Sequence, residues 1–106
     1  MIKLDDFKKL EIKIGKILEV NDHPNADKLY VVKVDVGGSE RQLVAGVKGS
    51  YAKEALIGKL VVVLTNIDPA MLRGVESQGM ILAASDETGI SVLTTDKPVK
   101  LGSIVK

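Results

Sequence analysis

Hydrophobic and polar residues alternate along much of this chain, which is the pattern of β-strands that bury one face. From residue 10 to residue 20 the apolar side chains fall on every second position, except where Gly15 and Lys16 interrupt the alternation. A glycine in the middle of a strand indicates a bend, and such bends let a sheet coil into a small barrel. We therefore expect one long, bent strand over residues 10–20.

The same alternation, or a short apolar run, recurs along the rest of the chain. It predicts strands at residues 29–36, 41–45, 59–66, 80–84, 90–94 and 103–105. Residues 60–64 are apolar throughout, so this strand is expected to be buried on both faces. Short helical segments are predicted at residues 5–10, where aspartates precede lysines, and at residues 51–56.

Five core strands with one short helix between the third and the fourth have the element order of an OB-fold, an all-β, five-stranded Greek-key barrel. The strands after the fifth are expected to form an added ribbon towards the C-terminus. A small β-sandwich would show similar strand spacing, so the pattern alone leaves that alternative open. With 106 residues, the chain is expected to form a single domain over residues 1–106.

Composition adds limits on the class of protein. The apolar residues, 45% of the chain, are mostly valine, isoleucine and leucine, and ten glycines accompany them, as in β-rich folds. The chain has no cysteine, so disulfides and thiolate metal sites are excluded. The N-terminus carries acidic residues rather than an apolar run, and no stretch approaches the roughly 20 apolar residues of a membrane span. We expect a soluble, cytoplasmic protein that does not enter a membrane.

The connection between the predicted strands at 59–66 and 80–84 is the most informative segment. It contains a proline, Arg73, a serine and two glycines, with little hydrophobic surface. A domain that only had to fold would join two strands by a short hairpin. This connection is therefore the first candidate for a binding surface.

Three segments together resemble a known family, the tRNA-binding domain. They are residues 23–29 (HPNADKL), residues 34–37 (VDVG) and residues 66–84, which include the highly specific LRGVESQGM. This domain is appended to methionyl-tRNA synthetases, as a C-terminal domain or beta subunit, and is related to the endothelial monocyte-activating polypeptide. The resemblance extends from Phe7 to the end of the chain.

The resemblance implies an OB barrel that binds tRNA by its shape and assists aminoacylation without being an enzyme. It also implies a homodimer, whose interface the N-terminal turn and the C-terminal strands supply, and methionyl-tRNA synthetase as a possible partner. Because the chain begins with Met1, a separate tRNA-binding protein or detached beta subunit is expected. The alternative is a dimeric export chaperone or protein-interaction module on the same barrel, which ranks second because related proteins of that kind lack the RGVESQGM segment.

The residues themselves favour phosphate and shape recognition over base stacking. OB-folds that bind single strands stack bases on aromatic side chains, and this chain has only Phe7, Tyr30 and Tyr51. Net charge is only +1, but residues 28–73 carry seven basic and four acidic side chains, a mild positive bias. These features suit folded RNA better than a general single-strand binder.

Five residues are the candidates for contact with tRNA. Lys33 and Arg41 are expected side by side on the polar face of the second and third strands, as phosphate contacts. Arg73 can form paired hydrogen bonds with phosphate oxygens or a base edge, and the alternative is a solvated loop charge. Asn66 and Ser77 either bind RNA or brace the backbone around them, and both readings stay open.

Other residues are given structural roles. Met80 is expected to plug the end of the barrel. His23 is the only histidine and lies beside a proline, so a turn residue is expected rather than a metal ligand. None of the common nucleotide-binding or catalytic motifs occurs in the chain, and we expect no catalytic residue, metal or cofactor.

Overall fold

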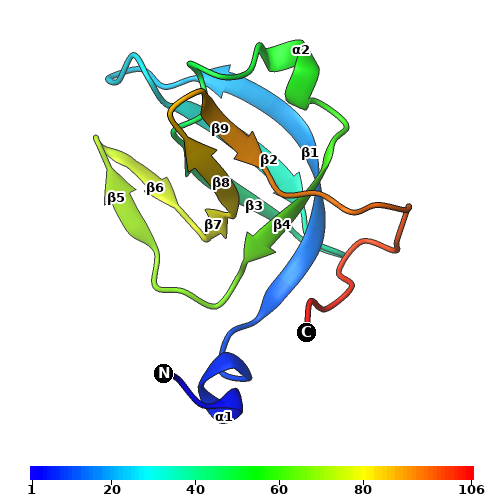
Figure 1. Ribbon diagram of the computed structural model, residues 1–106. Coiled ribbons are helices and arrows are strands. Elements are labelled where there is room, and N and C mark those ends of the chain that lie inside the picture. Colours follow the sequence, from blue (N-terminus) through cyan, green and yellow to red (C-terminus); the bar gives the residue numbers. More distant parts are fainter.

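The computed structural model describes residues 1–106, and its centre is a curled five-stranded antiparallel sheet (Figure 1). The strand order is β3-β2-β1-β4-β7. These strands are β1 (Ile12–Asp22), β2 (Tyr30–Asp35), β3 (Glu40–Ala45), β4 (Leu60–Leu64) and β7 (Met80–Ile81). The helix α2 (Lys53–Leu56) lies between β3 and β4 in the chain. The nearly closed barrel with one short helix confirms the expected OB-like fold.

The long first strand is bent as predicted. Its first half pairs with β4 and its second half with β2, with an irregular register between Ile17 and Glu19. A Cβ built on Gly15 would lie 2.6 Å from Cγ1 of Val34 and 3.0 Å from the carbonyl oxygen of Asp35. Only glycine therefore allows β1 to approach β2 this closely where the sheet bends.

The main core fills the inside of the barrel. Its most deeply buried side chains are Ile17, Val32, Val34, Leu43, Leu56, Val61 and Val63. Full burial of each such side chain stabilises the fold by roughly 1.5–3 kcal/mol. A smaller cluster of Ile12, Ile14 and Val62 lies against the chain ends, so β4 is buried on both faces as expected.

The connection after β4 differs from the prediction. It is not an irregular loop but a second hairpin, β5 (Ala70–Leu72) and β6 (Val75–Ser77) (Figure 1). The predicted strand at 80–84 is also divided, because Leu82 separates β7 from β8 (Ala83–Asp86). β8 pairs with β9 (Gly89–Val92) in a hairpin outside the five-stranded sheet. The added ribbon therefore uses the second half of the expected fifth strand, and not only the strands that follow it as predicted.

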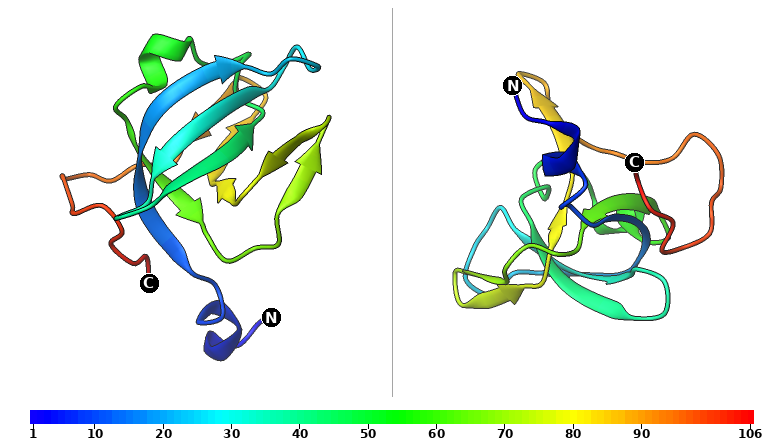
Figure 2. Two further views of the ribbon diagram at one scale, coloured as in Figure 1. Left: turned by 180° about the vertical axis from the view of Figure 1, so that it is seen from behind. Right: turned by 90° about the horizontal axis from the view of Figure 1, so that it is seen from below.

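The two chain ends meet the barrel at its lower end in Figure 1. The helix α1 (Leu4–Phe7) projects away from the barrel, as Figure 1 and the left view of Figure 2 show. The expected last strand is reduced to one bridge, between Lys13 and Ile104, although Val105 also donates to the carbonyl of Ile12 at 2.9 Å. No helix has the length and apolar character needed to cross a membrane.

Candidate functional site

The tip of the β5–β6 hairpin holds an arginine in an unusual backbone conformation. Arg73 and Gly74 are the two turn residues, with φ angles of 53° and 88°. Such two-residue turns favour Asn-Gly, because both positions need positive φ. Arg73 is the one non-glycine residue of the chain with positive φ, at a cost of about 1 kcal/mol. An exposed arginine held where asparagine would be less strained points to a use for its side chain.

A clamp formed by His23 and Asn25 holds this tip. The Nε2 of the buried His23 donates to the carbonyl of Leu72 at 2.9 Å, and its Nδ1 accepts from the backbone N–H of Asn25 at 2.9 Å. The side-chain amide of Asn25 donates to the carbonyl of Arg73 at 3.3 Å, and Nη2 of Arg73 reaches the carbonyl of Asn25 at 3.5 Å. Two of the segments that carry the family resemblance are therefore in direct contact.

Sequence reasoning gave His23 a turn role and missed the clamp. The turn itself is present, but the histidine also bridges 49 residues of chain to reach Leu72. One feature of the sequence could have indicated this contact: residues 23–29 and 66–84 are the strongest parts of the same family resemblance.

Polar side chains at the end of β6 and just after it close the seam between the hairpin and β3. The backbone N–H of Val44 donates to Oγ of Ser77 at 3.0 Å, and this hydroxyl donates to the carbonyl of Gly79 at 2.9 Å. Oε1 of Gln78 accepts from the N–H of Gln42 at 3.0 Å, and the Gln78 N–H donates to the Gln42 carbonyl at 2.8 Å. The backbone N–H groups of Gln42 and Val44, on the free edge of β3, thereby find their hydrogen-bond acceptors in side chains.

These contacts bear on the two readings that were open for Ser77. Its side chain is buried and its hydroxyl makes two hydrogen bonds within the chain, so the bracing alternative fits this position and RNA contact does not. Asn66 is likewise occupied: Oδ1 accepts from the N–H of Glu11 and Nδ2 donates to the carbonyl of Lys9, each at 2.7 Å. The structure therefore assigns Asn66 to bracing the start of β1 against the end of β4.

Lys33 and Arg41 are not side by side, contrary to the prediction. Lys33 is paired with Gln42 on the outer face, whereas Arg41 is paired with the buried Val34 on the inner face. Cross-strand partners share a face of the sheet, and the partner of Lys33 is the residue after Arg41. Since successive residues of a strand point to opposite faces, the two cations lie on opposite faces. Nη1 of Arg41 donates to the carbonyls of Thr65 at 2.6 Å and Gln78 at 3.0 Å. Lys33 is exposed and Arg41 is half-buried.

Met80 does not plug the barrel, because its side chain is 46% exposed. Gly79 takes the crowded position instead: a Cβ there would lie 2.9 Å from the carbonyl oxygen of Leu64. Met80 lines an apolar groove of about 440 Å³ between the hairpin and the barrel. Ile67, Leu72 and Ile81 line the same groove.

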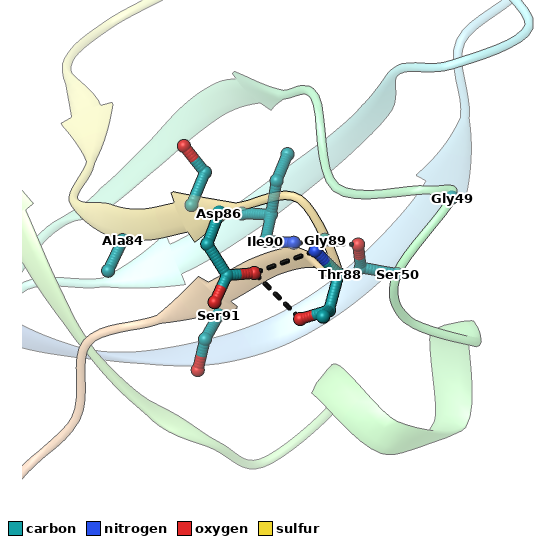
Figure 3. A pocket seen from close by; sticks show the side chains of 9 residues that line it. Gly49, Ser50, Ala84, Asp86, Thr88, Gly89, Ile90 and Ser91 are labelled. Carbon is teal, nitrogen blue, oxygen red and sulfur yellow. Dashed lines mark hydrogen bonds between the residues drawn. The ribbon is translucent and has the colours of Figure 1, made fainter.

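A second hollow, of about 430 Å³, is polar and lies beside the β8–β9 turn (Figure 3). Asp86 accepts from both the N–H and the hydroxyl of Thr88, and these bonds lower the pKa of its carboxyl. Ser50 accepts from the N–H of Ile90 at 3.1 Å. The lining has one carboxylate and no basic side chain, so this hollow does not suit a phosphate.

A further charged cluster lies at the end of β1. Asp22 binds Lys48 through Oδ1 and Lys53 through Oδ2, each at 3.1 Å. Hydrogen bonds from Lys53 and then Lys48 hold the pKa of Asp22 below its ordinary value. The sequence showed no sign of this cluster, because spacing along the chain does not reveal that α2 brings Lys53 to the same carboxylate as Lys48.

Comparisons with known proteins agree on the family. Residues 12–104 match the family described as "Putative tRNA binding domain". The methionine–tRNA ligase of Thermococcus kodakarensis is 56% identical over 105 residues, which are 99% of this chain and 14% of that protein. The chain therefore spans about a seventh of the length of such curated relatives.

Two of the solved structures that cover the whole chain are about 30% identical to it. A MetRS related protein from Pyrococcus horikoshii has a TM-score of 0.92 at 31% identity, with 100% of this chain and 98% of that one covered. A CsaA chaperone protein from Picrophilus torridus has a TM-score of 0.93 at 29% identity, with both chains covered fully. The resemblance inferred from residues 23–29, 34–37 and 66–84 is confirmed. This chain belongs to the family of tRNA-binding domains.

Proposed function

We propose that this chain binds tRNA by its shape and phosphates, as a non-catalytic domain that assists aminoacylation. The observation that carries the proposal is the exposed Arg73, held with positive φ on a hairpin tip that His23 and Asn25 clamp. The strain and the clamp both serve to present the guanidinium to a ligand. The family match and the methionine–tRNA ligase relatives support tRNA as that ligand.

The aromatic residues support phosphate recognition rather than base stacking. Tyr30 is buried, and its hydroxyl donates to the carbonyl of Tyr51 at 2.7 Å. The Tyr51 hydroxyl accepts from the N–H of Val92 at 3.0 Å, and Phe7 packs on the smaller core cluster. All three rings have structural roles, so contacts of cations with phosphates are the available source of affinity.

Three cations are assigned to tRNA contact in the proposal, although Lys33 and Arg41 lie on opposite faces of the sheet. Arg73 makes the main contact, Lys33 adds a phosphate contact on the outer wall, and Arg41 contributes through Nε and Nη2, which make no hydrogen bond within the chain. Arg41 lines a shallow hollow of about 380 Å³ with Ser39 and Pro69. Asn66 and Ser77 shape the site as braces.

Arg73→Asn tests the assignment because its effects on binding and on folding have opposite signs. Loss of the guanidinium should weaken tRNA binding by about tenfold and lower the slope of log affinity against log salt by roughly one. Asparagine tolerates the positive φ of this turn, so the variant should be as stable as the wild type or slightly more stable. Fluorescence anisotropy with labelled tRNA at several salt concentrations, with thermal unfolding alongside, measures both. A stable variant with unchanged affinity would refute the role of Arg73.

We propose further that the chain acts as a homodimer through its two ends. Leu4 is 67% and Ile104 54% exposed, and both line an apolar hollow of about 200 Å³ with Phe7 and Val105. A second copy would remove this surface from water. Light scattering should give twice the chain mass of 11.3 kDa, and a charge at both positions, Leu4→Lys/Ile104→Lys, should give the monomer. A wild-type monomer at high concentration argues against the dimer.

A second candidate function is the binding of apolar peptide segments, as in a chaperone. The apolar groove beside Met80 and the likeness to a CsaA chaperone protein favour it. It ranks second because a groove contact gives no reason for the strained arginine at the hairpin tip. Met80→Glu should abolish peptide binding and leave tRNA binding intact, which isothermal titration with each ligand would distinguish.

A further inference from the structure

Asp22, Lys48 and Lys53 form a compact cluster in which one carboxylate holds two ammonium groups. Lys48 Nζ lies 3.1 Å from Oδ1, and Lys53 Nζ lies 3.1 Å from Oδ2. The three side chains are 53%, 34% and 38% exposed, respectively. Lys48 also lies 6.0 Å from the centre of the Tyr30 ring, which further restricts it. The cations are therefore held close together at a surface that solvent reaches.

The cluster lies next to the clamp that holds Arg73. Asp22 ends β1 and is followed directly by His23, whose ring binds the hairpin tip at Leu72. Lys53 begins α2, which lies at the same end of the barrel as the end of β1, the upper end in Figure 1. The loop after β1 is thus flanked by Arg73 on one side and by the two lysines on the other.

Fold stability gives little reason for this cluster. Exposed ion pairs contribute little to stability, because solvent screens them and the long side chains lose freedom. A single carboxylate also leaves one of the two positive charges uncompensated. Two converging ammonium groups fit a phosphate, whose oxygens can occupy the places of Oδ1 and Oδ2.

We infer that Lys48 and Lys53 form a second phosphate-binding site for tRNA, and that Asp22 competes with the phosphate inside the free protein. That the ligand is tRNA rests on the proposed function. The site at Lys48 and Lys53 and the competing role of Asp22 go beyond it. Asp22 keeps the lysines ordered, and its negative charge lowers the affinity of the site. Removing this charge therefore strengthens tRNA binding, which a purely structural ion pair would not do.

Asp22→Asn is the direct test, and Asp96→Asn is its matched control. Both raise net charge by one, but Asp96 makes no ion pair. By anisotropy with labelled tRNA, Asp22→Asn should bind about threefold to tenfold tighter at low salt, with a salt slope steeper by roughly one. Asp96→Asn should bind like the wild type. An affinity of Asp22→Asn equal to that of Asp96→Asn, or weaker, overturns the inference.

The double variant Lys48→Gln/Lys53→Gln provides a second test, which changes the lysines and not Asp22. This double variant should bind tRNA more weakly, with a salt slope lower by up to about two, and adding Asp22→Asn to it should give no gain. Unchanged affinity of the folded double variant overturns the inference. If the wild type binds tRNA through Arg73 while these variants behave like the control, only this inference fails. If the wild type binds no tRNA, the proposed function fails as well.

Discussion

Residues of the β5–β6 hairpin are subject both to the demands of the fold and to those of the proposed tRNA contact, and Arg73 is the clearest example. Its type and its neighbours in the sequence made it a candidate, but its positive φ follows from the two-residue turn, which only the structure reveals. Ser77 shows the reverse, since a polar residue in a candidate segment is buried and satisfied within the fold. Exposure and hydrogen-bond partners, rather than residue type, separate the candidate ligand contacts from the braces here.

Gly79→Ala is expected to destabilise the fold by about 2 kcal/mol or more, because the residue has a φ of 144° and the new Cβ would lie 2.9 Å from the Leu64 carbonyl oxygen. Gly49→Ala is the control, since nothing lies within 4 Å of its Cβ. Urea unfolding of both variants measures the difference. Equal stability of the two would contradict the crowding of Gly79 against the Leu64 carbonyl at the end of β4.

Acid should weaken the fold partly through Asp22. The pKa of this group is lower in the folded chain than in the unfolded one, because Lys53 and Lys48 bind its charged form. Its contribution to stability is therefore present above the unfolded pKa of about 3.9 and is lost as pH falls through the lower, folded pKa. The melting temperature of Asp22→Asn should fall less steeply than that of the wild type below about pH 4. Parallel curves would show that these ion pairs do not persist in solution.

At the scale of elements, the sequence predicted the main strands because each buries a regular apolar face. The bend at Gly15 followed from the same alternation. The β5–β6 hairpin was missed because all three residues of β5 are exposed and show no alternation of burial, and because Arg-Gly is an uncommon pair for its turn. The face of the sheet on which each β3 side chain lies was also missed. The sequence does not show at which residue the alternation between inner and outer side chains begins in this strand.

The hairpin and the loop after β1 are expected to act as one unit. His23→Ala removes the bond to Leu72 and the acceptor for Asn25, so the tip should lose its position and tRNA affinity should fall by about threefold to tenfold. In an Arg73→Asn background the same change should have little further effect on binding. Additive losses in this double-mutant cycle would indicate that His23 does not act through Arg73.

At the scale of the whole molecule, the barrel is a support that carries several cations on separate elements. Arg73 comes from a hairpin, Lys33 from the outer wall of β2, and Lys48 and Lys53 from the region around α2. The fold and the family were predictable from strand order and three segments, because both depend on local pattern. The arrangement of the site was not, because it depends on contacts such as that between His23 and Leu72 over 49 residues.

The most direct test of the central claim is the salt dependence of tRNA binding by the wild type and by Lys33→Ala/Arg73→Asn. The proposal predicts that log affinity falls linearly with log salt for the wild type, and that the double variant binds more weakly with a slope lower by roughly two. Both proteins should have the same circular dichroism spectrum. Wild-type binding that does not depend on salt, or a folded double variant on the same line as the wild type, would contradict a phosphate-reading surface built on Arg73 and Lys33.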